Sequence, residues 1–129
     1  MVHVLKAMAS AGGGVVVNTA STAGSAAMAE FSAYCASKHA IIGLTRCAAR
    51  EYARQNIRVC AVCPSTTATP MVERFERQWP EWQAKQNASF PVGRVGTAEE
   101  VAEAVVWLCS DACPFVTGTC LTIDGGAGA

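Results

Sequence analysis

The sequence predicts an α/β fold with parallel strands, on three observations. Two short apolar runs rich in valine, residues 15–19 and 57–63, are bounded by glycine, asparagine or proline and are typical of buried strands. The stretch between them, from Ser32 to Gln55, contains no proline and is rich in helix-forming residues. A strand, a helix and a second strand form a βαβ unit, so the crossover is expected to be right-handed and the strands parallel.

The first half of the chain follows this scheme in order. Residues 2–11 have the pattern of the last turns of a helix, which the three glycines at 12–14 would end. The run 15–19 is then expected to be fully buried, with a loop of small residues after it. The long helix should end at Asn56, because asparagine readily adopts the left-handed conformation that closes a helix.

The second half is less regular. Residues 65–96 contain three prolines and several aromatic residues, which predicts a loop carrying one or two short helices. Thr97 and Glu100 form a capping-box pattern, which opens a helix that continues to about Ser110. Its inward side is expected to carry Val101, Val105 and Leu108. The last strand is expected over residues 119–123, before a tight turn.

Composition excludes several classes of function. The 129 residues include ten basic and ten acidic side chains, with zero net charge and no basic stripe for nucleic acid or an anionic membrane. No apolar run reaches transmembrane length, and the start does not resemble a signal peptide. Seven cysteines, an odd number, indicate reduced thiols and a cytoplasmic location. The high apolar content, 51%, indicates a piece of a larger fold.

Tyr34 and Lys38 are the residues most suggestive of chemistry. Four residues apart on a helix, they share one face. A phenol has a pKa near ~10, and a neighbouring cation favours its ionised form. The pair can therefore act as a proton donor and acceptor. A tyrosine and a lysine at this spacing are, however, more often a solvated helix face, and context has to decide between the two interpretations.

That context is present in the surrounding sequence. Ser21 stands thirteen residues before Tyr34, on the loop after an expected buried strand. Residues 33–38 read Ala-Tyr-Cys-Ala-Ser-Lys, and residues 43–46 read Gly-Leu-Thr-Arg. This arrangement of serine, tyrosine and lysine resembles the short-chain dehydrogenase/reductase family.

The resemblance continues in order along the rest of the chain. The matching segments are residues 56–59, 64–71, 93–96, 99–102, 116–118 and 124–126. It implies that residues 1–129 are the C-terminal portion of a single Rossmann-like domain, with a substrate loop at about residues 65–96. Ser65 stands where the family usually has glycine.

The resemblance also implies an activity, the transfer of hydride between NAD or NADP and an alcohol or carbonyl substrate. Tyr34 would exchange a proton with the substrate oxygen, Lys38 would lower the pKa of Tyr34, and Ser21 would hold that oxygen. The residues expected to contact the cofactor are Tyr34, Lys38, Pro64, Ser65, Thr67 and Thr69. By the same resemblance, the full-length protein would be a homo-oligomer, a dimer or tetramer, with residues 41–52 at the interface.

The family pattern is incomplete in this chain. The glycine-rich turn between a strand and a helix, which binds the cofactor's pyrophosphate, is absent, and the glycines at 12–14 precede a strand instead. The chain is thus expected to supply part of a doubly wound parallel sheet that lacks its N-terminal nucleotide-binding half, with Met1 an internal methionine. The first strand would have an unpaired edge. The alternative to an active enzyme is a truncated, catalytically inactive fragment.

Other motifs have a structural and a functional interpretation. Cys60 and Cys63 match a C-x-x-C redox or zinc pattern, but residues three apart on a strand point to opposite faces, so no metal site is expected. His39 is expected at the surface or in an interface. Trp79 and Trp82 could cover a hydrophobic substrate as part of a lid, or anchor the loop.

Overall fold

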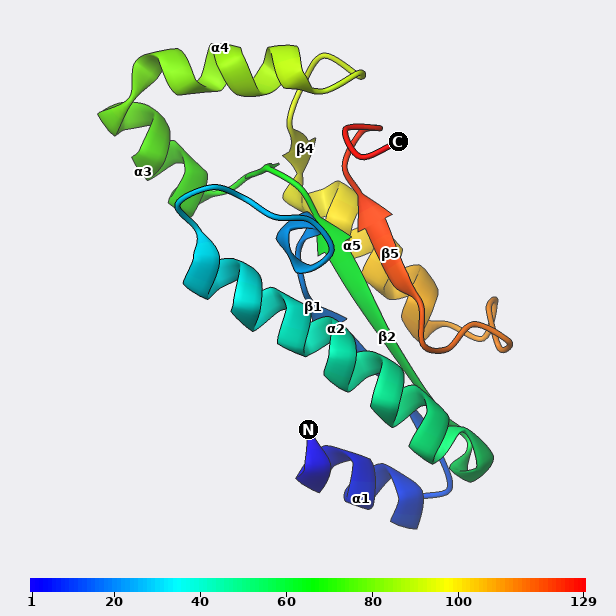
Figure 1. Ribbon diagram of the computed structural model, residues 1–129. Coiled ribbons are helices and arrows are strands. Elements are labelled where there is room, and N and C mark those ends of the chain that lie inside the picture. The colour runs from blue at the N-terminus through cyan, green and yellow to red at the C-terminus, as the bar shows by residue number, and fades with distance from the viewer.

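The computed structural model describes residues 1–129, apart from the side chains of Pro80 and Gln83. At its centre is a three-stranded parallel sheet in the order β1-β2-β5. The strands are β1 (Gly14–Thr19), β2 (Ile57–Pro64) and β5 (Cys120–Ile123). Figure 1 shows helices on both sides of this sheet. The α/β class and the parallel strands predicted from the sequence are confirmed.

The helices α1 (Val2–Ser10) and α2 (Ser32–Tyr52) cover one face of the sheet. Leu5 of α1 packs there with Ile57 and Val59 of β2, and all three are nearly inaccessible to solvent. A short 3-10 turn, Ala53–Gln55, ends α2, and Asn56 follows it with φ of 58°. The left-handed stop predicted at Asn56 is confirmed.

Helix α5 (Ala98–Cys109) covers the opposite face. Its start has the predicted capping box: the Thr97 hydroxyl accepts from the Glu100 amide at 3.2 Å, and the Glu100 carboxylate accepts from the Thr97 amide at 2.8 Å. At its other end, Arg58 of β2 donates to the carbonyl oxygens of Leu108 and Ser110, at 2.7 and 2.8 Å. Because a cation stabilises the negative end of a helix dipole, this contact fixes α5 to the sheet.

The prediction that the first strand is fully buried was wrong. Residues 14–18 of β1 are only half-buried and Thr19 is exposed. The reason is the position of β1 at the edge of the sheet, with β2 as its one partner strand in the described chain. The apolar sequence of β1 is that of a central strand, and the unpaired edge expected from the sequence is present.

The segment between β2 and α5 forms a projecting helical hairpin. It contains α3 (Pro70–Gln78) and α4 (Pro80–Ser89), in agreement with the predicted short helices. A two-residue parallel pairing, β3 (Thr67–Ala68) with β4 (Gly96–Thr97), closes its base and was not predicted. Figure 1 shows α3 and α4 beyond the end of the sheet at which the arrow of β2 points. Across the described residues, no helix has the length and apolar character needed to span a membrane.

The core contact between α5 and β2 can be tested with a matched pair of substitutions on one helix. Leu108 is fully buried against Cys60 and Val62, whereas Val106 is 69% exposed. We expect Leu108→Ala to lower the free energy of unfolding of the intact protein by about 3 kcal/mol, because it leaves a cavity. Val106→Ala should change it by less than about 0.5 kcal/mol. Urea unfolding followed by circular dichroism measures both, and equal effects would contradict this packing.

Candidate active site

The predicted site residues gather where β1 and β2 end. Ser21 follows the end of β1, and the segment 64–69 closes β2 and continues into α3. Because β1 and β2 are parallel neighbours, both connections leave from the same edge of the sheet. In open α/β sheets this carboxyl edge is where ligands bind.

Lys38 links this edge to α2. Its ammonium nitrogen Nζ donates to the carbonyl oxygen of Thr19, the last residue of β1, at 3.1 Å. The same nitrogen lies 5.6 Å from the centre of the Tyr34 ring, within the range of a cation–π contact. An ammonium group has three donors, so hydrogens remain for a second partner. The pairing of Tyr34 with Lys38 expected from their spacing is therefore present.

Tyr34 and Ser21 differ in exposure. Tyr34 is 43% exposed, so its ring can be reached from solvent. Ser21 is 8% exposed, and its hydroxyl oxygen accepts from the amide of Ala23 at 3.1 Å. In the described chain, the side chains of Ser21, Tyr34 and Lys38 share no direct hydrogen bond. They are brought to one edge by the backbone elements that carry them.

Gly24 sets how closely the serine-bearing turn approaches α2. It ends the 3-10 turn Thr22–Gly24 that follows Ser21. A Cβ at this position would lie 2.8 Å from both the Lys38 carbonyl oxygen and the Ile42 side chain. Only glycine permits so close an approach, so Gly24 fixes the turn against the helical segment that carries Lys38. Sequence reasoning missed this residue, because a single glycine in a loop of small residues gives no distinctive signal.

The segment after β2 is held by local contacts. The Ser65 amide donates to the carbonyl oxygen of Ile123 at 3.0 Å, and the Thr67 hydroxyl donates to the Ser65 carbonyl oxygen at 3.1 Å. The Thr69 hydroxyl oxygen accepts from the Val72 amide at 3.4 Å and caps α3. The four predicted residues Pro64, Ser65, Thr67 and Thr69 thus lie on one connection beyond the carboxyl edge. The hydroxyls of Thr67 and Thr69 help to shape it.

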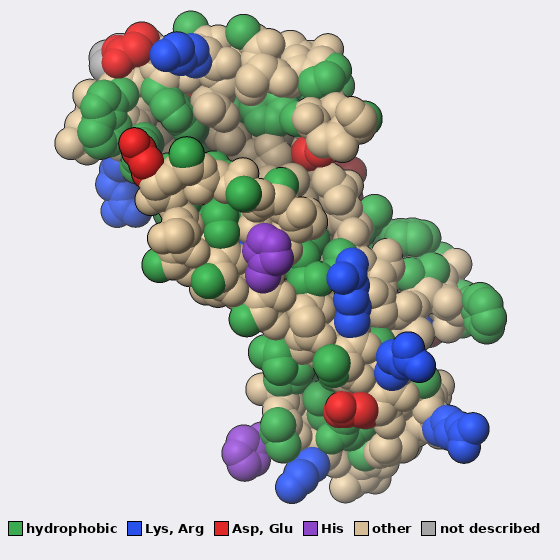
Figure 2. Space-filling model, viewed as in Figure 1, with side chains coloured by type: hydrophobic (Ala, Val, Ile, Leu, Met, Phe, Trp, Pro, Cys, Tyr) green, Lys and Arg blue, Asp and Glu red, His purple; other side chains and the backbone are tan. Residues whose placement is uncertain are grey.

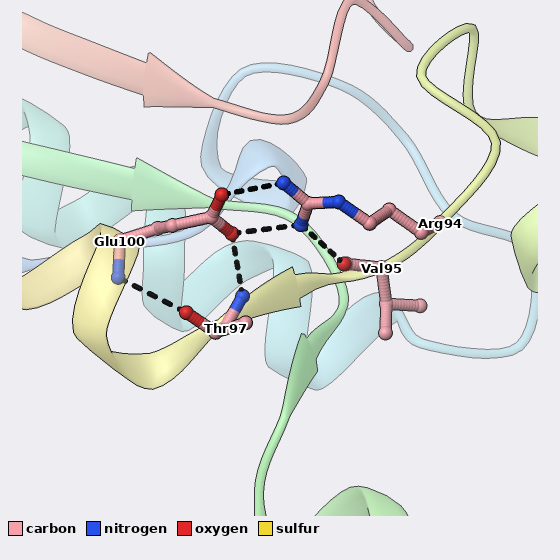
Figure 3. A network of polar contacts seen from close by, with 4 residues as sticks. All are labelled: Arg94, Val95, Thr97 and Glu100. Carbon is pink, nitrogen blue, oxygen red and sulfur yellow. Dashed lines mark hydrogen bonds and ion pairs between the residues drawn. The ribbon is translucent and has the colours of Figure 1, made fainter.

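A second polar network joins the hairpin to α5 (Figure 3). Arg94 makes a bidentate ion pair with Glu100, with N–O distances of 2.9 and 2.6 Å. Hydrogen bonds from Arg94, then the amide of Thr97, lower the pKa of the Glu100 carboxyl to about 2. At the hairpin base, the Thr66 hydroxyl donates to the side-chain carbonyl of Gln86 at 2.9 Å. These contacts fix β3 and β4, the two strands at the base of the hairpin. The sequence predicted only one of them, the capping box between Thr97 and Glu100.

Cys60 and Cys63 do not form a paired site. Cys60 packs with Leu108 on one face of the sheet, and Cys63 packs with Ile42 on the other. Burial raises the pKa of both thiols. Among the described side chains, no group of three or more histidine, cysteine, aspartate or glutamate residues could hold a metal ion. His39 is exposed, as expected, and its Nδ1 contacts the Cys35 carbonyl oxygen at 2.9 Å.

The parallel sheet, with helices on both faces, defines the chain as part of a Rossmann-type α/β protein. The chain belongs to the short-chain dehydrogenase/reductase family: the family described as Enoyl-(Acyl carrier protein) reductase matches residues 1–128. The resemblance inferred from the sequence is thereby confirmed.

Named relatives agree with this assignment. The 2-(S)-hydroxypropyl-CoM dehydrogenase 3 of Xanthobacter autotrophicus is 46% identical over 116 residues, which are 88% of this chain and 46% of the relative. The cyclohexanol dehydrogenase of an Acinetobacter species is 42% identical over 125 residues, 97% of this chain and 47% of the relative. The solved structure "ElxO with NADP Bound" has a TM-score of 0.92 at 31% identity, covering 98% of this chain and 51% of that one. The chain therefore spans about half the length of the relatives that it matches.

The Arg94–Glu100 ion pair predicts a pH dependence. The pKa of Glu100 is lowered from 4.5 to about 2 in the folded chain, so its stabilising contribution is complete above about 4.5 and is lost as the pH falls towards 2. We expect Arg94→Met to raise the pKa of Glu100 towards its usual value. Carbon-13 NMR titration of the glutamate carboxyls measures this shift. Arg77→Met should leave Glu100 unchanged, because Arg77 contacts the backbone of Glu73 instead.

Thiol labelling tests the structural interpretation of the C-x-x-C motif. We expect Cys109, which is exposed and lies outside residues 41–52, to react first with Ellman's reagent at pH 7. Cys60 and Cys63 should react only after denaturation, because both are buried and the reactive thiolate is disfavoured. Mass spectrometry after alkylation locates the labels. Rapid labelling of both Cys60 and Cys63 in the folded protein would instead support a redox role for the motif.

Proposed function

We propose that the intact protein containing this chain is an NAD(P)-dependent oxidoreductase that interconverts a small alcohol and its carbonyl compound. The observation that carries the proposal is the position of Lys38, with its Nζ 5.6 Å from the centre of the Tyr34 ring and 3.1 Å from the Thr19 carbonyl oxygen. This contact places a fixed cation beside an accessible phenol at the carboxyl edge of the sheet. The dehydrogenase relatives and the NADP-bound structural neighbour support the same activity.

The residues at this edge fit the nicotinamide end of such a cofactor. Lys38 has ammonium hydrogens beyond the one given to Thr19, and a sugar hydroxyl is a suitable acceptor for them. The hydroxyls of Tyr34 and Thr69, and the backbone of Pro64, Ser65 and Thr67, offer donors and acceptors that suit a ribose and a carboxamide. We assign these six residues to cofactor binding. The bound nicotinamide would supply or accept the hydride.

The chemical role of the chain's own residues is to hold and move one proton. Tyr34 gives its phenolic proton to the oxygen of a carbonyl substrate, or removes a proton from an alcohol in the reverse direction. Lys38 holds a positive charge beside the Tyr34 ring, where it attracts the negative charge left on the oxygen when the proton is transferred. Ser21, held by its turn against α2, donates a hydrogen bond to the same substrate oxygen and stabilises the charge that develops there. The proposal places the residues 65–96 beside the substrate, as in the family.

Three further assignments belong to this proposal. The protein is placed in the cytoplasm, it binds a small-molecule substrate, and it assembles as a homodimer or homotetramer through residues 41–52. The competing hypothesis, a truncated and catalytically inactive fragment, predicts no change in absorbance at 340 nm with any alcohol or ketone, with either cofactor. A relative named as inactive, a 2-(S)-hydroxypropyl-CoM dehydrogenase 2, is 43% identical to this chain over 116 residues.

The role of Tyr34 is tested by removing one oxygen atom. We expect Tyr34→Phe to lower kcat of the intact protein by about 10²–10⁴-fold, because the proton donor is lost while the ring is kept. Tyr52→Phe is the matched control: it removes the same atom from the other tyrosine, at the far end of α2, and should change kcat by less than about twofold. NADH or NADPH absorbance measures both rates. Full activity of Tyr34→Phe would refute the assignment.

A further inference from the structure

Two cysteine thiols meet on the face of the sheet that α2 covers. Cys63 of β2 is 1% exposed, and Cys120, the first residue of the neighbouring strand β5, is half-buried. The register pairs Cys120 with Ala61, two residues before Cys63, so the two cysteines are diagonal neighbours. Residues two apart on a strand share a face, and both side chains pack in one cluster with Ala20 and Ile42. We call Cys63 and Cys120 the thiol pair.

The Cys63 sulfur also lies against the turn that carries Ser21. Burial, then the neighbouring Cys120 thiol, raises the pKa of the Cys63 thiol, whereas a hydrogen bond from the Ser21 backbone lowers this pKa. The buried member of the thiol pair therefore touches both its partner and the backbone of a proposed catalytic residue. Cys60 takes no part, because it packs with Leu108 on the opposite face.

The spacing of the thiol pair suits a bridging atom better than a disulfide. Diagonal neighbours on adjacent strands lie about 7–8 Å apart, whereas a disulfide usually joins Cα atoms about 4.4–6.8 Å apart. A direct bond between the two sulfurs would therefore require the strands to shift. Two metal–sulfur bonds of about 2.3 Å each would span roughly 4.6 Å between the sulfurs, which the same backbone can accommodate.

The surroundings of the thiol pair select the kind of ion. Among the residues that the structure describes, no group of three metal-binding side chains is present, so an ion that needs four protein ligands, such as zinc, lacks them here. Thiolate sulfur is a soft donor and favours soft metal ions. The cluster around the pair is apolar, and an uncompensated charge is costly to bury there. Two thiolates with one divalent ion form a neutral complex.

We propose that Cys63 and Cys120 bind one soft divalent metal ion, of the mercury(II) type, in a two-coordinate site, and that this binding disturbs the turn that carries Ser21. Each thiol gives its proton to water, two S–H bonds are replaced by two sulfur–metal bonds, and nothing is oxidised. The half-buried Cys120 gives access from solvent. Figure 2, which views the molecule from the side of α2, shows hydrophobic surface beside this helix in the direction of β5. The site does not rest on the proposed function.

Native mass spectrometry of the intact protein, with mercury(II) chloride and an equal concentration of glutathione, tests the site. An ion on a single thiol, such as Cys109, would carry glutathione as its second ligand and show the added mass. The thiol pair should bind the ion alone. We expect Cys63→Ala and Cys120→Ala each to weaken this glutathione-free binding by about 10²–10⁴-fold, because one of two linked bonds is lost.

The matched control is Cys60→Ala, which removes a buried thiol from the same strand but from its other face, and it should retain the ion. Retention in both variants of the thiol pair, or loss in Cys60→Ala, would overturn the proposal. Circular dichroism checks that each variant is folded. Because Cys120 is only half-buried, Cys120→Ala keeps the test decisive if Cys63→Ala fails to fold.

Two spectroscopic measurements examine the geometry and the coupling to Ser21. X-ray absorption at the mercury edge should show two sulfur neighbours, and a four-sulfur shell would refute the two-coordinate site. In amide NMR spectra, the ion should shift the Ser21 resonance of the parent protein but not that of Cys120→Ala. An unchanged Ser21 resonance in the loaded parent would refute the coupling. Neither measurement needs turnover, so both outcomes are independent of the oxidoreductase assignment.

Discussion

The hydrogen bond from the Lys38 ammonium to the Thr19 carbonyl oxygen joins the end of β1 to the second turn of α2, and the geometry of the candidate site depends on it. The Ala20 amide donates to the Val62 carbonyl oxygen of β2 at 2.8 Å. Successive residues of a strand direct their amide and carbonyl groups to opposite sides, so the Thr19 carbonyl faces away from β2. That side is the open edge of the described sheet. A flexible ammonium group with three donors can satisfy this carbonyl and still face a ligand.

Pro64 explains why the sheet opens at this level. Continuation of the ladder would require an amide at position 64 to donate to Ala20, and proline has none. The pairing with β1 therefore ends, and the chain after Ala20 turns into the 3-10 turn that carries Ser21. Gly24 then allows that turn to touch α2. The absence of an amide donor at Pro64 and of a Cβ at Gly24 therefore lets the turn with Ser21 lie against the helix that carries Tyr34 and Lys38. The three side chains are brought to one place without a direct hydrogen bond between them.

The features that could be predicted from the sequence are those with a local signal. The βαβ unit, the left-handed Asn56 and the Thr97–Glu100 capping box each follow from residues close together in the chain, and each is confirmed. The pairing of β3 with β4 joins Thr67 to Gly96, which are 29 positions apart in the sequence. Each of these strands is only two residues long, so neither has a periodic pattern that sequence analysis could detect. The prediction that β1 is fully buried failed for another reason. Its valines are typical of a central strand, but the burial of a strand also depends on what lies at its outer edge. The Tyr34–Lys38 contact followed from helical spacing, whereas the approach of Ser21 to α2 depends on a tertiary contact at Gly24.

The distribution of polar contacts also separates the rigid from the variable parts of the candidate site. Lys38 is tied to the sheet by its hydrogen bond to the Thr19 carbonyl oxygen, and Ser21 is held within its own turn by the Ala23 amide. The base of the hairpin is tied by the Arg94–Glu100 and Thr66–Gln86 contacts. The ring of Phe75 on α3 contacts those of Trp79 and Trp82, which lie in the same hairpin. A proton-transfer group needs a fixed position, because small displacements of reacting atoms are costly. Hydrophobic contact is not directional, so the exposed apolar side chains of α3 can vary more freely than the residues fixed at the sheet edge.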